Sequence, residues 1–96
     1  MTTTQRSMRK GSDVLTYHSD PAHGWLAVPL AEYPDARTFG TGFGYIDRAS
    51  GVVYLETDYE APAFLAAHPD ATFATIVYDD FCSAIRSLPR IPDAKG

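Results

Sequence analysis

The sequence has a single cysteine, Cys82, and it has no long apolar run. One thiol cannot form a disulfide within the chain, and it excludes a zinc or iron–sulfur site built from several thiolates. No apolar run approaches the roughly 18–20 residues that span a bilayer, and the N-terminus lacks the apolar region of a signal peptide. We therefore expect a cytoplasmic protein without a membrane partner.

Basic residues are scarce in the middle of the chain. Residues 11–80 contain eleven acids against Arg37 and Arg48, a formal net charge of −9, whereas residues 1–10 carry three bases and no acid. A strongly acidic body repels phosphate backbones and attracts basic surfaces. The charge pattern therefore argues against direct nucleic-acid binding and favours docking on a nucleic-acid-binding protein, although acidity can also serve solubility alone.

A phosphate-binding loop is also missing. The segment Gly40-Thr41-Gly42-Phe43-Gly44 is dense in glycine, but a predicted strand follows it. Phosphate loops lead into a helix whose N-terminus binds the anion, so this segment does not fit. We interpret these glycines as a sharp entry into the next strand.

The 96 residues, of which 45% are hydrophobic and 12% aromatic, are enough for one small packed domain. Residues 1–12 are polar and basic and are predicted to be a flexible arm. Residues 13–92 form the single domain, and residues 93–96 are a frayed tail. A domain of this size buries only about 60–65% of its chain surface, so a deep active site is not expected.

Runs of β-formers between turn residues predict strands at residues 14–18, 25–28, 43–47, 52–56 and 72–78. The two middle runs flank a short loop ending in Gly51 and predict a β-hairpin. A short helix is predicted over residues 60–67, because Pro62 suits a first turn and Pro69 prevents continuation. The connection from Thr57 to Ala71 is long enough for the strands on either side of it to run parallel.

Two other segments are expected to be irregular. Residues 30–42 are predicted to be a loop with at most one helical turn at residues 30–33, and residues 79–96 an extended tail. The fold class is therefore α+β: a small mixed, mainly antiparallel sheet of four to five strands with one short helix on one face.

The densest polar stretch runs from His18 to Pro29. His18, Asp20 and His23 could ligate a metal and support a small metal-dependent hydrolase, since imidazole and carboxylate suit zinc, manganese or iron. The competing interpretation is that Asp20 makes a turn, the histidines bond backbone groups and Trp25 anchors the core. Further along, Glu56 and Asp58 could form an acid/base pair or simply be exposed carboxylates.

Several blocks of the chain resemble a family of small proteins borne on plasmids and phages. The blocks are His18-Ser19-Asp20-Pro21-Ala22-His23-Gly24-Trp25-Leu26-Ala27-Val28-Pro29, Val53-Tyr54-Leu55-Glu56-Thr57-Asp58, Phe64-Leu65 and Ile85-Arg86-Ser87. The chain departs from that family at Asp79-Asp80, where a histidine is usual, and at Tyr59, where a cysteine is usual. The resemblance implies a mobile-element context, in which small acidic proteins such as anti-CRISPR proteins block host defence complexes.

Charge and resemblance together predict a non-enzymatic protein that inhibits a host defence complex by occupying its basic, nucleic-acid-binding surface. It would be a monomer or weak homodimer and would need no cofactor. Tyr45 could add a further aromatic anchor. The predicted partner-binding residues are the following acids and tyrosines: Asp47, Glu56, Asp58, Glu60, Asp79, Asp80, Tyr54 and Tyr59.

Overall fold

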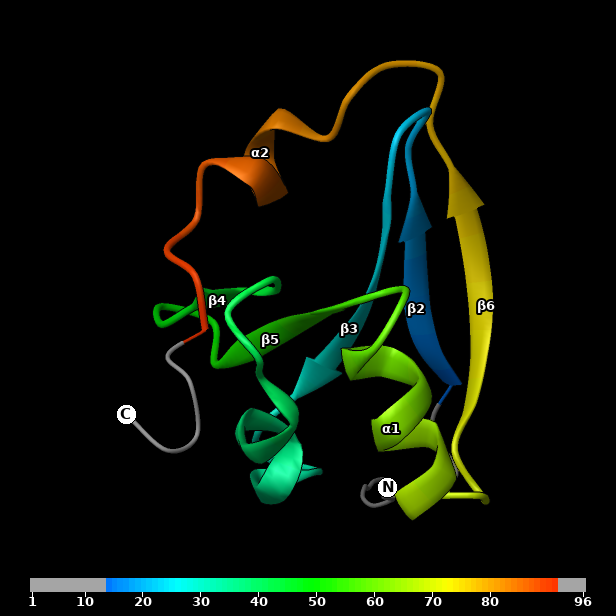
Figure 1. The fold of residues 1–96 in the computed structure, drawn as a ribbon, viewed down its shortest axis with the longest axis vertical. Coiled ribbons are helices and arrows are strands. Elements are labelled where there is room, and N and C mark those ends of the chain that lie inside the picture. Colours follow the sequence, from blue (N-terminus) through cyan, green and yellow to red (C-terminus); the bar gives the residue numbers. More distant parts are fainter. Residues whose placement is uncertain (1–13, 92–96) are drawn as a thin grey trace, which may run out of the picture.

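A computed structural model describes residues 14–91; the predicted arm at residues 1–12 and the predicted tail at residues 93–96 lie outside this range. The described chain forms one five-stranded mixed sheet with short helices (Figure 1), which confirms the predicted α+β class. Its strands are β2 (Val14–Ser19), β3 (Gly24–Pro29), β4 (Tyr45–Asp47), β5 (Val52–Glu56) and β6 (Thr72–Val77).

The strand order across the sheet is β4-β5-β3-β2-β6. Only β2 and β6 pair in parallel; the other three pairs are antiparallel. It follows that β5 and β6 have the same sense within the twisted sheet, as their long connection predicts, but β3 and β2 separate them. Figure 1 shows β6 at the outer edge of the sheet, with the β4–β5 hairpin crossing the direction of β2 and β6 steeply.

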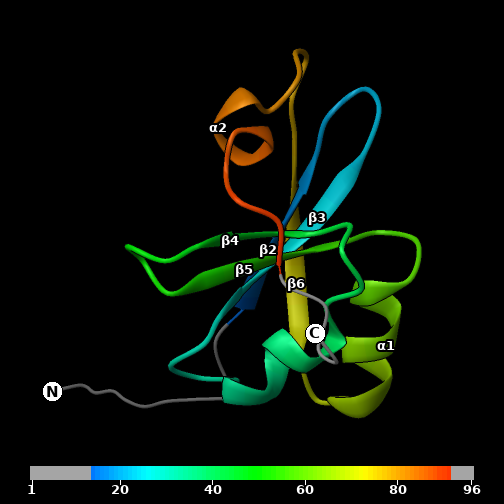
Figure 2. The same cartoon turned by 60° about the vertical axis from the view of Figure 1, so that its left-hand side comes forward.

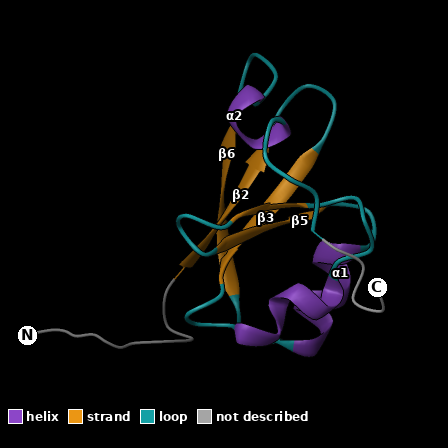
Figure 3. Ribbon diagram, turned by 90° about the vertical axis from the view of Figure 1, so that its left-hand side faces the viewer, coloured by secondary structure: helices purple, strands orange, loops and turns teal. Residues whose placement is uncertain are grey.

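Helix α1 (Glu60–Ala67) confirms the predicted helix, and it packs beside a 3-10 helix, η2 (Pro34–Phe39). Both lie at one end of the molecule (Figure 3). The predicted turn at residues 30–33 is present, since the N–H groups of Glu32 and Tyr33 donate to the Pro29 carbonyl. The prediction of at most one helical turn in this loop is wrong, because η2 follows it: Pro34 presets the backbone angle of a helical start. Within residues 14–91 no helix is long and apolar enough to cross a membrane.

The segment after β6 was predicted to be extended, but it contains a short helix. Residues Ser83–Arg86 form a short helix, α2, which lies well apart from α1 (Figure 2). Ile85 of α2 is buried, and Arg86 bonds Asp20. These two tertiary contacts hold a helical turn that four residues alone could not sustain.

The two faces of the sheet carry separate apolar clusters, because side chains alternate along each strand. The larger cluster lies on the face that α1 and η2 cover; it contains Leu15, Leu26, Val28, Tyr33, Ala36, Ile46, Val53, Leu55, Ala61, Phe64 and Ile91. Trp25 points to the other face, where it packs with Tyr45 and Ile85. Trp25 is therefore a core residue as predicted, but of the smaller cluster.

Candidate functional site: an acidic aromatic pocket

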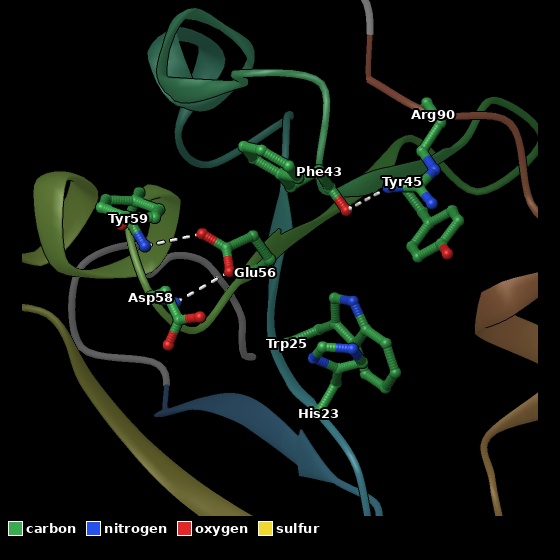
Figure 4. A pocket seen from close by; sticks show the side chains of 8 residues that line it. All are labelled: His23, Trp25, Phe43, Tyr45, Glu56, Asp58, Tyr59 and Arg90. Carbon is green, nitrogen blue, oxygen red and sulfur yellow. Dashed lines mark hydrogen bonds between the residues drawn. The ribbon is translucent and has the colours of Figure 1, made fainter.

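A pocket of about 290 Å³ opens where β3 and β4 begin and β5 ends. Aromatic and charged side chains from four stretches of the chain surround it (Figure 4). Its lining residues are His23, Trp25, Phe43, Tyr45, Glu56, Asp58, Tyr59 and Arg90. It combines an aromatic wall with two carboxylates and the Arg90 guanidinium, and its acidic side is suited to binding a cationic or amphipathic group.

The aromatic walls differ in exposure. Trp25 and Tyr45 are buried and meet edge to face, with ring centroids 6.1 Å apart. Phe43 and Tyr59, by contrast, are 55% and 69% exposed. The buried pair forms a rigid base, and the exposed pair offers large apolar surfaces that solvent still reaches.

Glu56 holds the acidic side of the pocket in place. Its Oε2 accepts a hydrogen bond from the backbone N–H of Asp58 at 2.9 Å, and its Oε1 accepts one from the N–H of Tyr59 at 2.6 Å (Figure 4). Oε1 also accepts a bond from the N–H of Glu60 at 3.2 Å. The carboxylate thus stabilises the positive N-terminal end of α1. The same bonds fix the turn that presents Asp58 and Tyr59.

Glu60 was predicted to be a surface acid that contacts a partner, and that prediction is wrong. Its side chain is fully buried. Oε2 accepts bonds from the backbone N–H groups of Thr41, Phe43 and Gly44 and from the Thr41 hydroxyl, and Oε1 accepts one from the Glu56 N–H. Five donors compensate the buried carboxylate. Glu60 therefore ties the loop bearing Phe43 to the start of α1.

This loop also explains why β4 is shorter than predicted. Residues 43 and 44 were expected in the strand, but their N–H groups donate to Glu60 instead of to a neighbouring strand. Gly42 adopts a φ of 95°, a conformation that favours glycine. The glycines thus make the sharp entry into the hairpin that the sequence predicts.

Arg90 closes the opposite side of the pocket. Its guanidinium lies over the Tyr45 ring, 4.7 Å from the centroid, and donates to the carbonyls of Gly42 and Phe43. These contacts span more than 40 positions of sequence. No local pattern in the chain indicates them, and the sequence reasoning missed Arg90 and Phe43 as site residues.

The structure separates His18, Asp20 and His23 rather than assembling them around a metal. The Nδ1 atom of His18 lies 2.8 Å from the Tyr78 hydroxyl, and burial lowers the pKa of this histidine. His23 lies beside the Trp25 ring. Among the residues the structure describes, no three His, Cys, Asp or Glu side chains are grouped as metal ligands.

Asp20 makes the turn before β3 and anchors α2. Its Oδ1 accepts bonds from the N–H groups of Ala22 and His23, and its Oδ2 accepts from the Cys82 N–H; Arg86 donates to both oxygens. Burial by itself raises the pKa of Asp20, but these donors outweigh it and hold the pKa well below its usual range. The interpretation of Asp20 as a residue that makes a turn is therefore confirmed.

Cys82 is half-buried next to this ion pair. Burial raises the pKa of its thiol, the Asp20 charge adds to that effect, and Arg86 opposes it. The thiol therefore stays protonated near neutral pH and is a poor nucleophile.

The remaining predicted partner-binding residues lie outside the pocket. Asp47 accepts bonds from the N–H groups of Ala49 and Ser50 in the hairpin turn. Tyr54 is half-buried on the same sheet face as Tyr45, beside His18, and burial raises its pKa. Asp79 and Asp80 are exposed in the connection between β6 and α2. The structure thus brings together Glu56, Asp58 and Tyr59 from the predicted set.

Comparison with protein-family models, curated proteins and solved structures finds no match for the chain. The resemblance to plasmid- and phage-borne proteins therefore rests on the sequence blocks alone.

Proposed function

We propose that this protein is a non-enzymatic, acidic interaction protein from a mobile element, which inhibits a host defence complex in the manner of an anti-CRISPR protein. It occupies a basic surface of that complex that otherwise binds nucleic acid. The protein acts in the cytoplasm, as a monomer or weak homodimer, and without a cofactor.

The pocket beside the start of α1 is the observation that carries this proposal. Exposed aromatic rings stand next to the carboxylates of Glu56 and Asp58. Binding hot spots are enriched in aromatic side chains, and charge complementarity speeds encounter and selects the partner. A basic protein surface satisfies both features, whereas a phosphate backbone is repelled.

The surrounding charge supports the same partner. Residues 11–80 have a formal net charge of −9, and Asp58, Asp70, Asp79 and Asp80 are exposed. Such a field raises the association rate with a basic surface and weakens as salt increases. Asp79 and Asp80 extend the acidic surface beyond the pocket.

A retention experiment tests the proposal. The tagged protein is immobilised and exposed to a purified CRISPR effector complex at low and at high salt. We expect retention at low salt that declines as salt rises, and competition by the nucleic acid that the effector normally binds. An effector that passes through unretained at low salt, or that is retained equally at all salt concentrations, contradicts the proposal.

A further inference from the structure

The indole N–H of Trp25 is a hydrogen-bond donor at the pocket. The residue as a whole is 2% exposed, its nitrogen is not among the fully buried unpaired atoms, and no group in residues 14–91 accepts a hydrogen bond from it. Figure 4 shows the indole nitrogen directed toward the pocket that Trp25 lines. An acceptor on a bound molecule can therefore pair with this donor at the pocket.

A second group at the pocket, the Asp58 carboxylate, lacks a partner among the described residues, and it is an acceptor rather than a donor. The carboxylate of Asp58 is exposed and has no hydrogen-bond or ion-pair partner among the described residues. Glu56 next to it is fixed by three backbone donors, so the acidic side is preorganised. Asp58 can therefore receive a cation without giving up an existing contact.

The aromatic surfaces identify which cation fits. A guanidinium is planar, bonds a carboxylate through two N–H groups and stacks on aromatic rings, whereas an ammonium is a strongly hydrated point charge. The exposed rings of Phe43 and Tyr59 border the pocket that Asp58 lines. This combination suits arginine better than lysine.

The chain places two of its own arginines against aromatic rings, and one of them also pairs with a carboxylate. Arg86 donates to both oxygens of Asp20 and lies 5.2 Å from the Trp25 ring centroid and 5.0 Å from that of Phe81. Arg90 lies over Tyr45 and bonds two carbonyls. The Arg90 guanidinium covers the Tyr45 ring, whereas the side chains of Phe43 and Tyr59 remain mostly exposed at the pocket.

We propose that this pocket receives one arginine side chain of a protein partner. The guanidinium pairs with Asp58 and stacks on Phe43 or Tyr59, and Trp25 donates its indole N–H to a backbone carbonyl beside that arginine. The pocket volume of about 290 Å³ lies just below the roughly 300–1,000 Å³ of ligand pockets, which suits one side chain. This inference rests on the proposed function and names the group that the site recognises.

The test uses short capped peptides as probes. The sequence glycine–arginine–glycine is compared with the same peptide carrying citrulline, a neutral mimic of arginine, and with a lysine peptide. Because the chain has one tryptophan, its indole N–H gives a single NMR signal that reports on the pocket. We expect a saturable shift with the arginine peptide, and roughly tenfold weaker binding of the citrulline and lysine peptides.

Two variants complete the test. Asp58→Asn is expected to weaken the arginine peptide about tenfold, whereas Asp70→Asn, which removes the same charge from an exposed site outside the pocket, leaves it unchanged. Equal binding of all three peptides, no saturable shift, or equal effects of the two variants overturns the inference. If salt-sensitive retention of the effector persists in any of those cases, the proposed function stands and only the arginine pocket falls.

Discussion

Glu60 is predicted to be the polar residue on which the fold depends most. It accepts five hydrogen bonds while fully buried, four of them from the loop at residues 41–44. Glu60→Ala removes every acceptor at once. A buried donor left unpaired costs about 1–3 kcal/mol, and each bond that water can partly replace costs about 0.5–1.5 kcal/mol. Since only the Gly44 bond is wholly buried, we expect a loss of about 4 kcal/mol in the free energy of unfolding.

The conservative variant separates hydrogen bonding from packing. In Glu60→Gln the amide oxygen can replace Oε2 and keep the four loop bonds, but the amide nitrogen then faces the Glu56 N–H, donor against donor. We expect a loss of about 2 kcal/mol, half that of alanine. In a domain of this size, each kcal/mol lowers the melting temperature by about 4–8 °C.

Urea unfolding, followed by far-ultraviolet circular dichroism, measures these losses. Asp70→Asn, at an exposed site, should stay within about 0.5 kcal/mol of the wild type and serves as the control. An alanine variant as stable as the wild type, or a glutamine variant as unstable as alanine, would refute the account of the loop.

Three further predictions concern single groups. The pKa of Asp20 is lower in the folded protein than in the unfolded chain, where it is about 4. The ionised carboxylate therefore stabilises the fold above about pH 4, and this stabilisation is lost as the pH falls. In Asp20→Asn the free energy of unfolding should fall less steeply below about pH 4, as measured by unfolding at a series of pH values. Gly24→Ala should lower the free energy of unfolding by about 2 kcal/mol, because the added Cβ overlaps the Tyr17 ring. In Gly51→Ala the added Cβ meets no atom, so the loss should be only the roughly 1 kcal/mol that a φ of 72° costs a residue with a side chain. Thermal unfolding compares the two variants. Native Cys82 should react with a thiol reagent at neutral pH more slowly than in the unfolded chain, because burial raises its pKa, and equal rates would contradict this.

The sequence predicts the fold well wherever the determining signal is local. The hairpin at Gly51, with its φ of 72°, and the helix from Glu60 to Ala67 follow from turn residues and from prolines at suitable positions. The order of the strands does not follow, because the pairing of β6 with β2 depends on contacts across about 58 positions of the chain. Helix α2 was missed because Asp20 and the Trp25 cluster, both distant in sequence, stabilise it.

The candidate site was predicted only in part, for the same reason. Glu56, Asp58 and Tyr59 are close in sequence, and the turn after β5, which the Glu56 carboxylate fixes, brings them to one place. Charge alone cannot distinguish an exposed acid from a buried one, so Glu60 was assigned to the surface although five donors hold it inside. Phe43 reaches the pocket through the tight turn at Gly42, and Arg90 reaches it through contacts with residues distant in sequence. The spacing of apolar residues along the chain predicts neither.

The central claim is that the acidic face competes with nucleic acid for a basic protein surface. The most direct measurement is displacement of a fluorescent nucleic acid from a purified CRISPR effector by the wild type, by Asp58→Lys and by Asp70→Lys. We predict displacement by the wild type at low salt, little change with Asp70→Lys, and a clear loss with Asp58→Lys. Failure of the wild type to displace the nucleic acid at low salt, or equal displacement by all three proteins, would contradict the account.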